Sequence, residues 1–232
     1  MKHVKIYEDF KSRSEIKAIC DEYDIKYWKL NSDGTLDVYR DVYLQNKFLN
    51  KLPLKFGKVE GNFFINDNKI NSLIGCPTIV SGGFYCYGNK IKSLIGSPKV
   101  VEFDFDCSDN KLTSLEGSPE KVRSFFCNDN ELTSLIGGPL IIDNYYQCFN
   151  NNITTFLGFP NFIDKSNILI FNNPISGIFD LFEDPSKIEL FNDFDIIRGN
   201  DLIIDRLNDF LVTIGEDQVD PLETFEGYNN IN

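Results

Sequence analysis

Four cysteines at a nearly constant spacing are the residues of this chain best suited to chemistry. Cys86, Cys107, Cys127 and Cys148 follow one another at intervals of 21, 20 and 21 residues. Four thiolates can hold a zinc ion when they surround it as a tetrahedron. If each cysteine lies on its own strand of a parallel sheet, however, the sulfurs form a line with steps of about 4.8 Å. We therefore predict no metal site and interpret the cysteines as small apolar core residues.

Other catalytic groups are scarce in the sequence. The chain has one histidine, His3, whereas Ser–His–Asp and Cys–His arrangements need an imidazole in a fixed position. The phosphate-binding patterns GxxxxGK[ST] and GxGxxG do not occur. The carboxylates are spread through a repeating frame, which is more typical of a solvated face than of paired catalytic acids. We expect a protein that is not an enzyme and that uses no cofactor.

The cysteines belong to a repeat that runs through most of the chain. The segment 82–98 reads GGFYCYGNKIKSLIGSP, and other units read GNFFINDNKINSLIGCP, FDFDCSDNKLTSLEGSP and RSFFCNDNELTSLIGGP. An asparagine recurs every 20 to 22 residues, at Asn68, Asn89, Asn110, Asn130, Asn151 and Asn173. A frame of apolar-x-apolar-x-x-Asn-x-apolar with a period in this range is the pattern of a leucine-rich repeat. Stacked units of this kind share one continuous core that no unit can form alone.

Each fixed position of the frame has a physical reason. Apolar residues two apart, such as Phe84 and Cys86, should point inward from a parallel sheet. The asparagine should hydrogen-bond backbone groups of its own loop and of the next coil. We therefore predict an α/β repeat solenoid, a right-handed coil of leucine-rich repeats with one parallel β-sheet on its concave side. Short 3₁₀ or extended return segments and helical end caps should complete it.

The repeat divides the chain into four parts. These are an N-terminal helical cap (1–41), seven leucine-rich repeats of about 21 residues (42–180), a C-terminal helical cap (181–215) and an acidic tail (216–232). A capping box at Ser12 and Glu15 predicts a first helix over about 13–23. A second helical region should begin after Asp184 and end at Gly215. The last part has five acidic residues and no basic ones, so we expect a partly ordered tail.

Several outward positions of the predicted strands carry aromatic residues. Such a stripe can be a cross-strand ladder that only stiffens a narrow sheet. It can also be an interaction surface, because contiguous apolar patches on proteins usually have a partner and tyrosine is favoured at interfaces. On the second interpretation we predict a protein-binding patch on the strand face, made of Phe64, Tyr85, Tyr87, Asp106, Phe126, Asp129 and Phe149.

The charge of the chain limits its partners. The formal net charge is -12 and the pI is near 4.6, so phosphate backbones and anionic lipid surfaces should be repelled. We expect no binding to nucleic acid or membranes, and an aromatic surface with an acidic border suits a basic protein segment instead. No apolar run has the length of a membrane span or the type of a signal peptide. We therefore expect a cytoplasmic protein with reduced cysteines.

The sequence also resembles a known group of proteins. The unit FYCxxNKLTSLxGxPxxV, the opening GTLDVYRDVYL with LPLKFGKVEGNF, and the ending DLIIDRLNDFL are similar to short leucine-rich-repeat proteins of tailed bacteriophages, over nearly the whole chain. The resemblance implies a protein-binding scaffold without catalytic residues. It suggests a phage protein that binds and modulates a host protein in the host cytoplasm. Two alternatives stay open: a structural or assembly component of a virion, and a carbohydrate-binding module.

Overall fold

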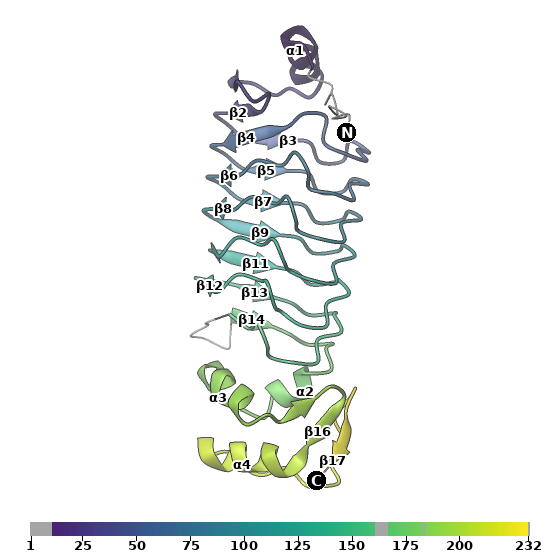
Figure 1. Cartoon of the computed structure of the whole chain (residues 1–232), viewed down its shortest axis with the longest axis vertical. Coiled ribbons are helices and arrows are strands. Elements are labelled where there is room, and N and C mark those ends of the chain that lie inside the picture. Colours follow the sequence, from purple (N-terminus) through teal and green to yellow (C-terminus); the bar gives the residue numbers. More distant parts are fainter. Residues whose placement is uncertain (1–10, 161–166, 183, 232) are drawn as a thin grey trace, which may run out of the picture.

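The chain forms a parallel β-solenoid of about six turns with few helices (Figure 1). The computed structural model describes residues 11–160, 167–182 and 184–231. Successive coils stack along the long axis of the molecule, with the helix α1 (Arg13–Glu22) at one end and the helices α3 (Ile188–Asp193) and α4 (Ile204–Ile214) at the other. The predicted solenoid is thus present.

Seven of the short strands form one parallel sheet in the order β14-β13-β11-β9-β7-β5-β3. They pair in register, so that equivalent residues of successive coils lie side by side, as Phe84 of β7 lies beside Phe105 of β9. These are the seven strands expected from the frame. Their bounds are β3 (Val42–Tyr43), β5 (Phe63–Phe64), β7 (Phe84–Tyr85), β9 (Asp104–Asp106), β11 (Ser124–Phe126), β13 (Tyr146–Gln147) and β14 (Ile168–Leu169).

The prediction of one parallel sheet is wrong, because a second series of strands lies in the return part of the coils. Its strands are β1 (Trp28–Leu30), β2 (Leu36–Val38), β4 (Phe56–Val59), β6 (Ile79–Val80), β8 (Val100–Val101), β10 (Lys121–Val122) and β12 (Ile141–Ile142). They form two sheets, β1-β2-β4-β6-β8 and β10-β12, whose paired strands run parallel apart from the antiparallel pair β1–β2. The physical reason is that the N–H and carbonyl groups of an extended backbone need hydrogen-bond partners. The next coil supplies them here, as when Ser81 N–H donates to the carbonyl of Val59 at 2.9 Å.

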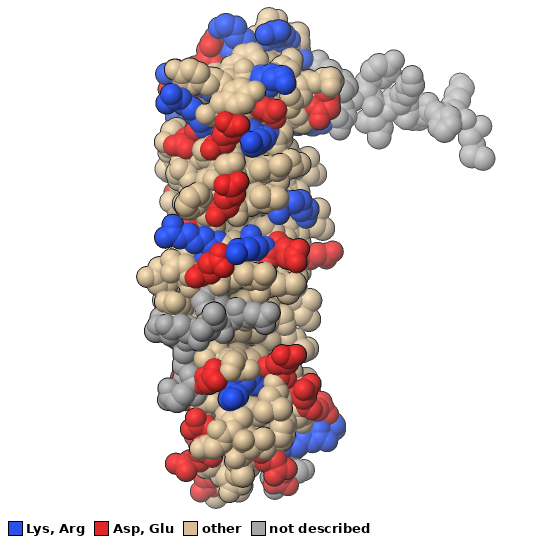
Figure 2. All heavy atoms as spheres, turned by 90° about the vertical axis from the view of Figure 1, so that its left-hand side faces the viewer, with Lys and Arg blue, Asp and Glu red and all other residues tan. Residues whose placement is uncertain are grey.

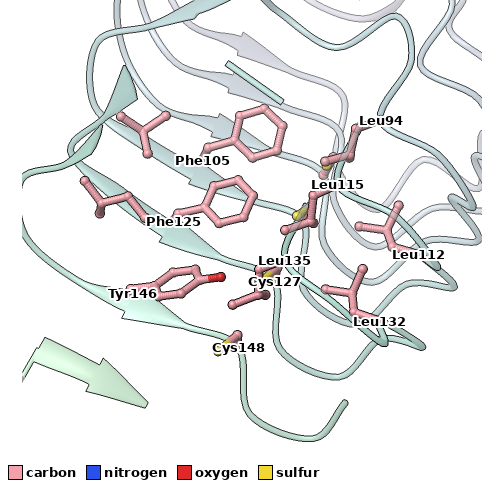
Figure 3. Close-up of a cluster of buried hydrophobic side chains, with 14 of the residues drawn as sticks. Leu94, Phe105, Leu112, Leu115, Phe125, Cys127, Leu132, Leu135, Tyr146 and Cys148 are labelled. Carbon is pink, nitrogen blue, oxygen red and sulfur yellow. The ribbon is translucent and has the colours of Figure 1, made fainter. Parts of the chain in front are cut away.

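The core is a column of aromatic rings lined by aliphatic side chains and thiols. Phe63, Phe84, Phe105, Phe125 and Tyr146 are all buried, and successive ring centroids in this column are 5.1 to 6.2 Å apart. Figure 3 shows the middle of this core, with leucines of the return segments facing the rings. Stacking therefore buries the same kind of side chain at the same level of each coil, which explains why the sequence repeats.

The asparagine side chains close the turns and join the coils, largely as predicted. Asn89 donates from Nδ2 to the carbonyls of Cys86, at 3.1 Å, and Ile65, at 2.9 Å, and its Oδ1 accepts from the N–H of Ile70 at 2.9 Å. Equivalent bonds are made by Asn68, Asn110, Asn130, Asn151 and Asn173. The one difference from the prediction is direction, because each asparagine bonds the preceding coil rather than the next one.

Helices lie at both ends of the stack where the sequence predicts them. The helix α1 begins with the expected capping box of Ser12 and Glu15, and α4 ends at Gly215, whose φ is 87°. Asp184 caps a 3₁₀ turn, η2 (Pro185–Lys187), that leads into α3, and a further short helix is α2 (Ser176–Phe179). The function of these helices as solenoid caps stays a prediction. In the described part of the chain, no helix is both long and apolar enough to span a bilayer.

Parts of the segment 216–231 are packed against the rest of the protein, and the expectation that this tail is partly ordered stays a prediction. Val219 and Phe225 are buried, and Tyr228 donates its hydroxyl to the carbonyl of Thr154 at 2.8 Å. Three strands form a sheet here, β15 (Ile197–Arg198), β16 (Asp201–Ile203) and β17 (Asn229–Ile231), with β17 parallel to β16. The apolar residues among the acids explain this outcome, since burying them offsets the entropy of ordering the segment.

Candidate functional site

The outward side of the seven-stranded sheet is the candidate binding surface, which we call the strand face. Two columns of side chains run along it from strand to strand. The first column is Tyr43, Phe64, Tyr85, Asp106, Phe126, Gln147 and Leu169, and the second is Gln45, Asn66, Tyr87, Ser108, Asn128, Phe149 and Phe171. They stand at outward positions because side chains alternate along a strand, and the residues between them fill the core.

The aromatic residues of the strand face form two separate stacks. In the first column the ring centroids of Tyr43 and Phe64 are 5.3 Å apart, those of Phe64 and Tyr85 are 4.7 Å apart, and the rings are within 8° of parallel. In the second column Phe149 and Phe171 stack at 4.6 Å. Within each stack the rings cover one another's flat sides. Only the ring edges and the outer flat sides of the end rings have no ring of the same stack against them.

All seven residues of the predicted patch lie on the strand face, but they do not form one aromatic surface. Phe64, Tyr85 and Phe126 are half-buried on β5, β7 and β11, and Tyr87 is half-buried directly after β7. Asp106 of β9 separates the rings of Tyr85 and Phe126 in the first column. Phe149 belongs to the other stack. The prediction omitted the stacked partners Tyr43 and Phe171, although they occupy the same frame positions and could have been found from them.

The position of Asp129 has a backbone explanation that the sequence interpretation missed. Asp129 has a φ of 55°, and residues at the same place in other coils also have positive φ: Asn46, Asp67, Gly88, Asp109, Asn150 and Asn172. Only glycine, asparagine and aspartate adopt this left-handed conformation readily. Asp129 is also bonded within the column, since Asn150 donates from Nδ2 to its Oδ1 at 2.7 Å. The acidic border of the patch thus follows partly from the turn.

The charged residues of the strand face are all acidic. The two columns are flanked by Asp41, Asn62, Gly83, Asp104, Ser124, Tyr145 and Asn167 before them and by the left-handed positions after them. These four columns contain six aspartates and no lysine or arginine. The side of the molecule seen in Figure 2 differs, because basic and acidic residues mix there. Ion pairs in the second series of strands and the loops that follow them include Lys58–Glu60 and Lys121–Asp143. Negative charge is therefore concentrated without compensation on the strand face.

Burial and like charge make negative charge costly at the centre of this face. Burial raises the pKa of Asp106, and the Ser108 hydrogen bonds oppose that shift only in part. The pKa of Tyr85 is raised by burial and then by the charges of Asp104 and Asp106, and that of Tyr87 is raised by burial and by Asp67 and Asp106. A cation placed among these groups would relieve both effects.

The cysteines are core residues, as predicted, and not part of this surface. Cys86, Cys107, Cys127 and Cys148 are free thiols with none of their surface exposed, and burial raises their pKa far above the ordinary value. Cys20 is buried as well, which raises its pKa to about 11. Within the described residues, no three His, Cys, Asp or Glu side chains are close enough together to hold a metal ion.

A cavity of about 770 Å³ lies at the N-terminal end and could not be predicted from the repeat. It is formed by α1, the loop between β1 and β2, and the return segment of the first coil, with apolar walls that include Ile19, Tyr23 and Leu49. Lys51 and Asp33 also line it, so its charge is mixed. The helix α1 and the loop between β1 and β2 have no counterpart in the other coils, and only the three-dimensional structure brings them together with the return segment.

Comparison with protein-family models, curated proteins and solved structures gives no match for this chain. Function therefore has to be argued from the residues of the chain itself.

Proposed function

We propose that this protein is a non-enzymatic scaffold that binds a basic segment of a partner protein through its strand face. The observation that carries the proposal is the combination of two aromatic stacks and six aspartates, without a lysine or arginine, on one face of seven strands. Aromatic residues are the side chains that most often anchor protein interfaces. Unbalanced negative charge attracts a positive partner and repels nucleic acids, which carry the same sign.

The strand face is better suited to this function than the outer side of the second series of strands. On the outer side of β6, β8 and β12 the exposed residues are scattered aliphatics, such as Ile79, Val100 and Ile141, among paired charges. Charges that are already paired offer a partner little, because a new contact must first break the existing one. The aspartates Asp104 and Asp106, by contrast, make no ion pair with any residue that the structure describes.

We further infer that the coils are leucine-rich repeats and that the terminal helices cap them. The period of 20 to 22 residues and the asparagine ladder support the first inference. The position of α1, α3 and α4 at the two ends supports the second. The similarity of the units to those of tailed-bacteriophage proteins leads us to propose a phage product that acts on a host protein in the host cytoplasm.

The function is tested by capture experiments with matched variants. The intact protein, a Tyr87→Ala/Phe149→Ala variant and an Ile79→Ala/Ile141→Ala variant are immobilised and exposed to a lysate of the cells in which the protein is made. We expect a stoichiometric protein that binds the intact chain and the Ile79/Ile141 variant and that is lost with the Tyr87/Phe149 variant. A partner that is lost only with the Ile79/Ile141 variant would place the site on the second series of strands and contradict the proposal.

A further inference from the structure

One aromatic ring is missing from the first column of the strand face, and its place is taken by Asp106. The rings of Tyr43, Phe64 and Tyr85 occupy successive strands, Asp106 follows directly beside Tyr85, and Phe126 follows beside Asp106. Neighbouring strands are about 4.8 Å apart, so the strands of Tyr85 and Phe126 are separated by roughly twice that distance. An aspartate is shorter than a phenylalanine, so this spacing leaves room for one further ring between Tyr85 and Phe126, above the half-buried Asp106. We call this space the slot.

Two carboxylates line this slot. Ser108 fixes the carboxylate of Asp106 by donating from its N–H, at 3.0 Å, and its hydroxyl, at 2.6 Å, to Oδ1. The Tyr85 ring leans toward the preceding column, since a Cβ on Gly83 would lie 2.5 Å from its hydroxyl oxygen. The residue of the next strand in that column is Asp104, whose charge contributes to the raised pKa of Tyr85. One side of the slot is thus an aromatic ring, and both Asp104 and Asp106 face it.

The surroundings of the slot are rich in acceptors and poor in donors. The four columns of the strand face contain no lysine or arginine. In the second column, Gln45 Oε1 and Asn66 Oδ1 are buried without a hydrogen-bond partner among the described residues, and Asn66 is only 4% exposed. Asn66 follows β5, and Tyr87 follows the neighbouring strand β7. Both atoms are closed to solvent and lie outside the slot, so a ligand rich in N–H groups is favoured only by the carboxylates of Asp104 and Asp106, which have no lysine or arginine beside them in the four columns.

We propose that this slot, formed by Tyr85, Asp104, Asp106 and Phe126, holds one arginine side chain of the basic partner segment. The inference rests on the proposed function and adds the residue type that the partner must present. A guanidinium is planar and about as thick as a ring, so it fills the place of the missing ring and stacks on Tyr85. It carries five N–H donors in a fixed fork, enough to bond both carboxylates. An ammonium has three donors on a rounder group and stacks less well.

The test compares nona-arginine and nona-lysine peptides, which carry the same charge, in titrations followed by calorimetry at low salt. We expect the intact protein to bind nona-arginine more tightly. Asp106→Asn should weaken that binding about tenfold, because a charge-assisted bond is lost, and should remove the preference for arginine. Asp109→Asn is the matched control: it removes the same charge three residues away, and asparagine occupies its left-handed position in other coils. This variant should retain the preference.

A second variant protects the test against effects on folding. Asp106→Phe restores the missing ring, so it should leave the melting temperature unchanged or higher and should abolish the preference for arginine. The slot proposal would be overturned if Asp106→Asn and Asp109→Asn weakened nona-arginine binding equally, or if the intact protein showed no preference for nona-arginine over nona-lysine. If Tyr87→Ala/Phe149→Ala still weakened peptide binding in that case, the proposed function would stand without the slot. Absence of binding by both peptides would overturn the slot and the basic-segment proposal together.

Discussion

The side chain of Asn110 crosses from its own coil to the carbonyl oxygen of Cys86, to which Nδ2 donates at 3.0 Å. The same nitrogen bonds the carbonyls of Cys107 and Ser108, and Oδ1 accepts from the N–H of Ile91 at 2.9 Å. Asn110 is only 3% exposed, so water does not replace these bonds. One amide therefore satisfies backbone groups of two coils at once, and the ladder of such amides holds successive coils in register.

The first prediction concerns Asn110→Asp, which keeps the shape of the side chain and removes its donors. Three backbone carbonyls then face a buried carboxylate, so we expect the free energy of unfolding to fall by about 3 kcal/mol or more. Urea unfolding followed by circular dichroism measures this loss. Asn71→Asp is the control, because Asn71 is exposed and outside the ladder, and it should change stability by less than about 0.5 kcal/mol. Similar losses in both variants would contradict the ladder account.

The asparagine ladder and the seven-stranded sheet were predictable from the sequence. The ladder needs an asparagine and the sheet needs two inward apolar residues in every repeat, and both recur every 20 to 22 residues. The second series of strands has a fainter signal. One buried residue marks it in each coil, at Val59, Val80, Val101, Val122 and Ile142, and these also recur every 20 or 21 residues. A single inward valine per strand does not show the alternation that identifies a strand in sequence. Pairing with the neighbouring coil, rather than local pattern, makes these segments strands.

The second prediction concerns the pH dependence of stability. Burial raises the pKa of Cys86, Cys107 and Cys127 above the ordinary thiol value of 9.0. The unfolded chain releases these protons as the pH rises through about 9, whereas the folded protein keeps them. The stabilising effect is complete below that pH and is lost above it, by about 1.4 kcal/mol per pH unit for each thiol.

Urea unfolding under reducing conditions at pH 8, 9 and 10 measures this slope. Cys107→Ala removes one buried thiol and should reduce the loss of stability between pH 9 and 10 by one thiol's share, about 1 kcal/mol, since half of the unfolded thiols are already ionised at pH 9. The native thiols should also react slowly with a thiol reagent at pH 8, because the reactive thiolate is scarce and inaccessible. Rapid labelling of the folded protein, or an equal slope in the variant, would mean that these side chains are not sealed in the core.

The third prediction compares two glycines that share a left-handed backbone but differ in surroundings. Gly158 has a φ of 83°, and a Cβ there would overlap the backbone nitrogen of Ile136 in the preceding coil. Gly199 has a φ of 63°, and a Cβ on it would have no other atom within 4 Å. Alanine at Gly199 should therefore cost only the backbone strain, about 1 kcal/mol. Gly158→Ala must also push two coils apart and should cost about 2 kcal/mol more; equal thermal shifts would show that the coils can separate freely.

The candidate site was predictable in its location and less so in its composition. The frame places Phe64, Tyr85 and Phe126 on one face because alternation along a strand is a local rule. The split of the aromatics into two stacks depends on which rings meet across strands. The conformation at Asp129 is a turn requirement, which in sequence looks the same as a charge selected for binding. Asp106 differs from Asp129, because its proposed role in binding can be inferred only once its neighbours on β7 and β11 are known.

The last prediction separates binding from stiffening on the strand face. Tyr85→Ala removes a ring that stacks on Phe64 at 4.7 Å, so it should lower the free energy of unfolding by about 1 kcal/mol. It should also weaken the binding of the captured partner by about 2 kcal/mol. Phe126 contacts no other ring among the described residues, so Phe126→Ala should weaken binding by a similar amount with a smaller loss of stability. Ile141→Ala, on the outer side of β12 and 43% exposed, is the control and should change neither quantity much. Thermal unfolding and calorimetry on the same samples measure both quantities. If both face variants lost stability and still bound the partner as tightly as the intact protein, the aromatic columns would serve only to hold the strands together.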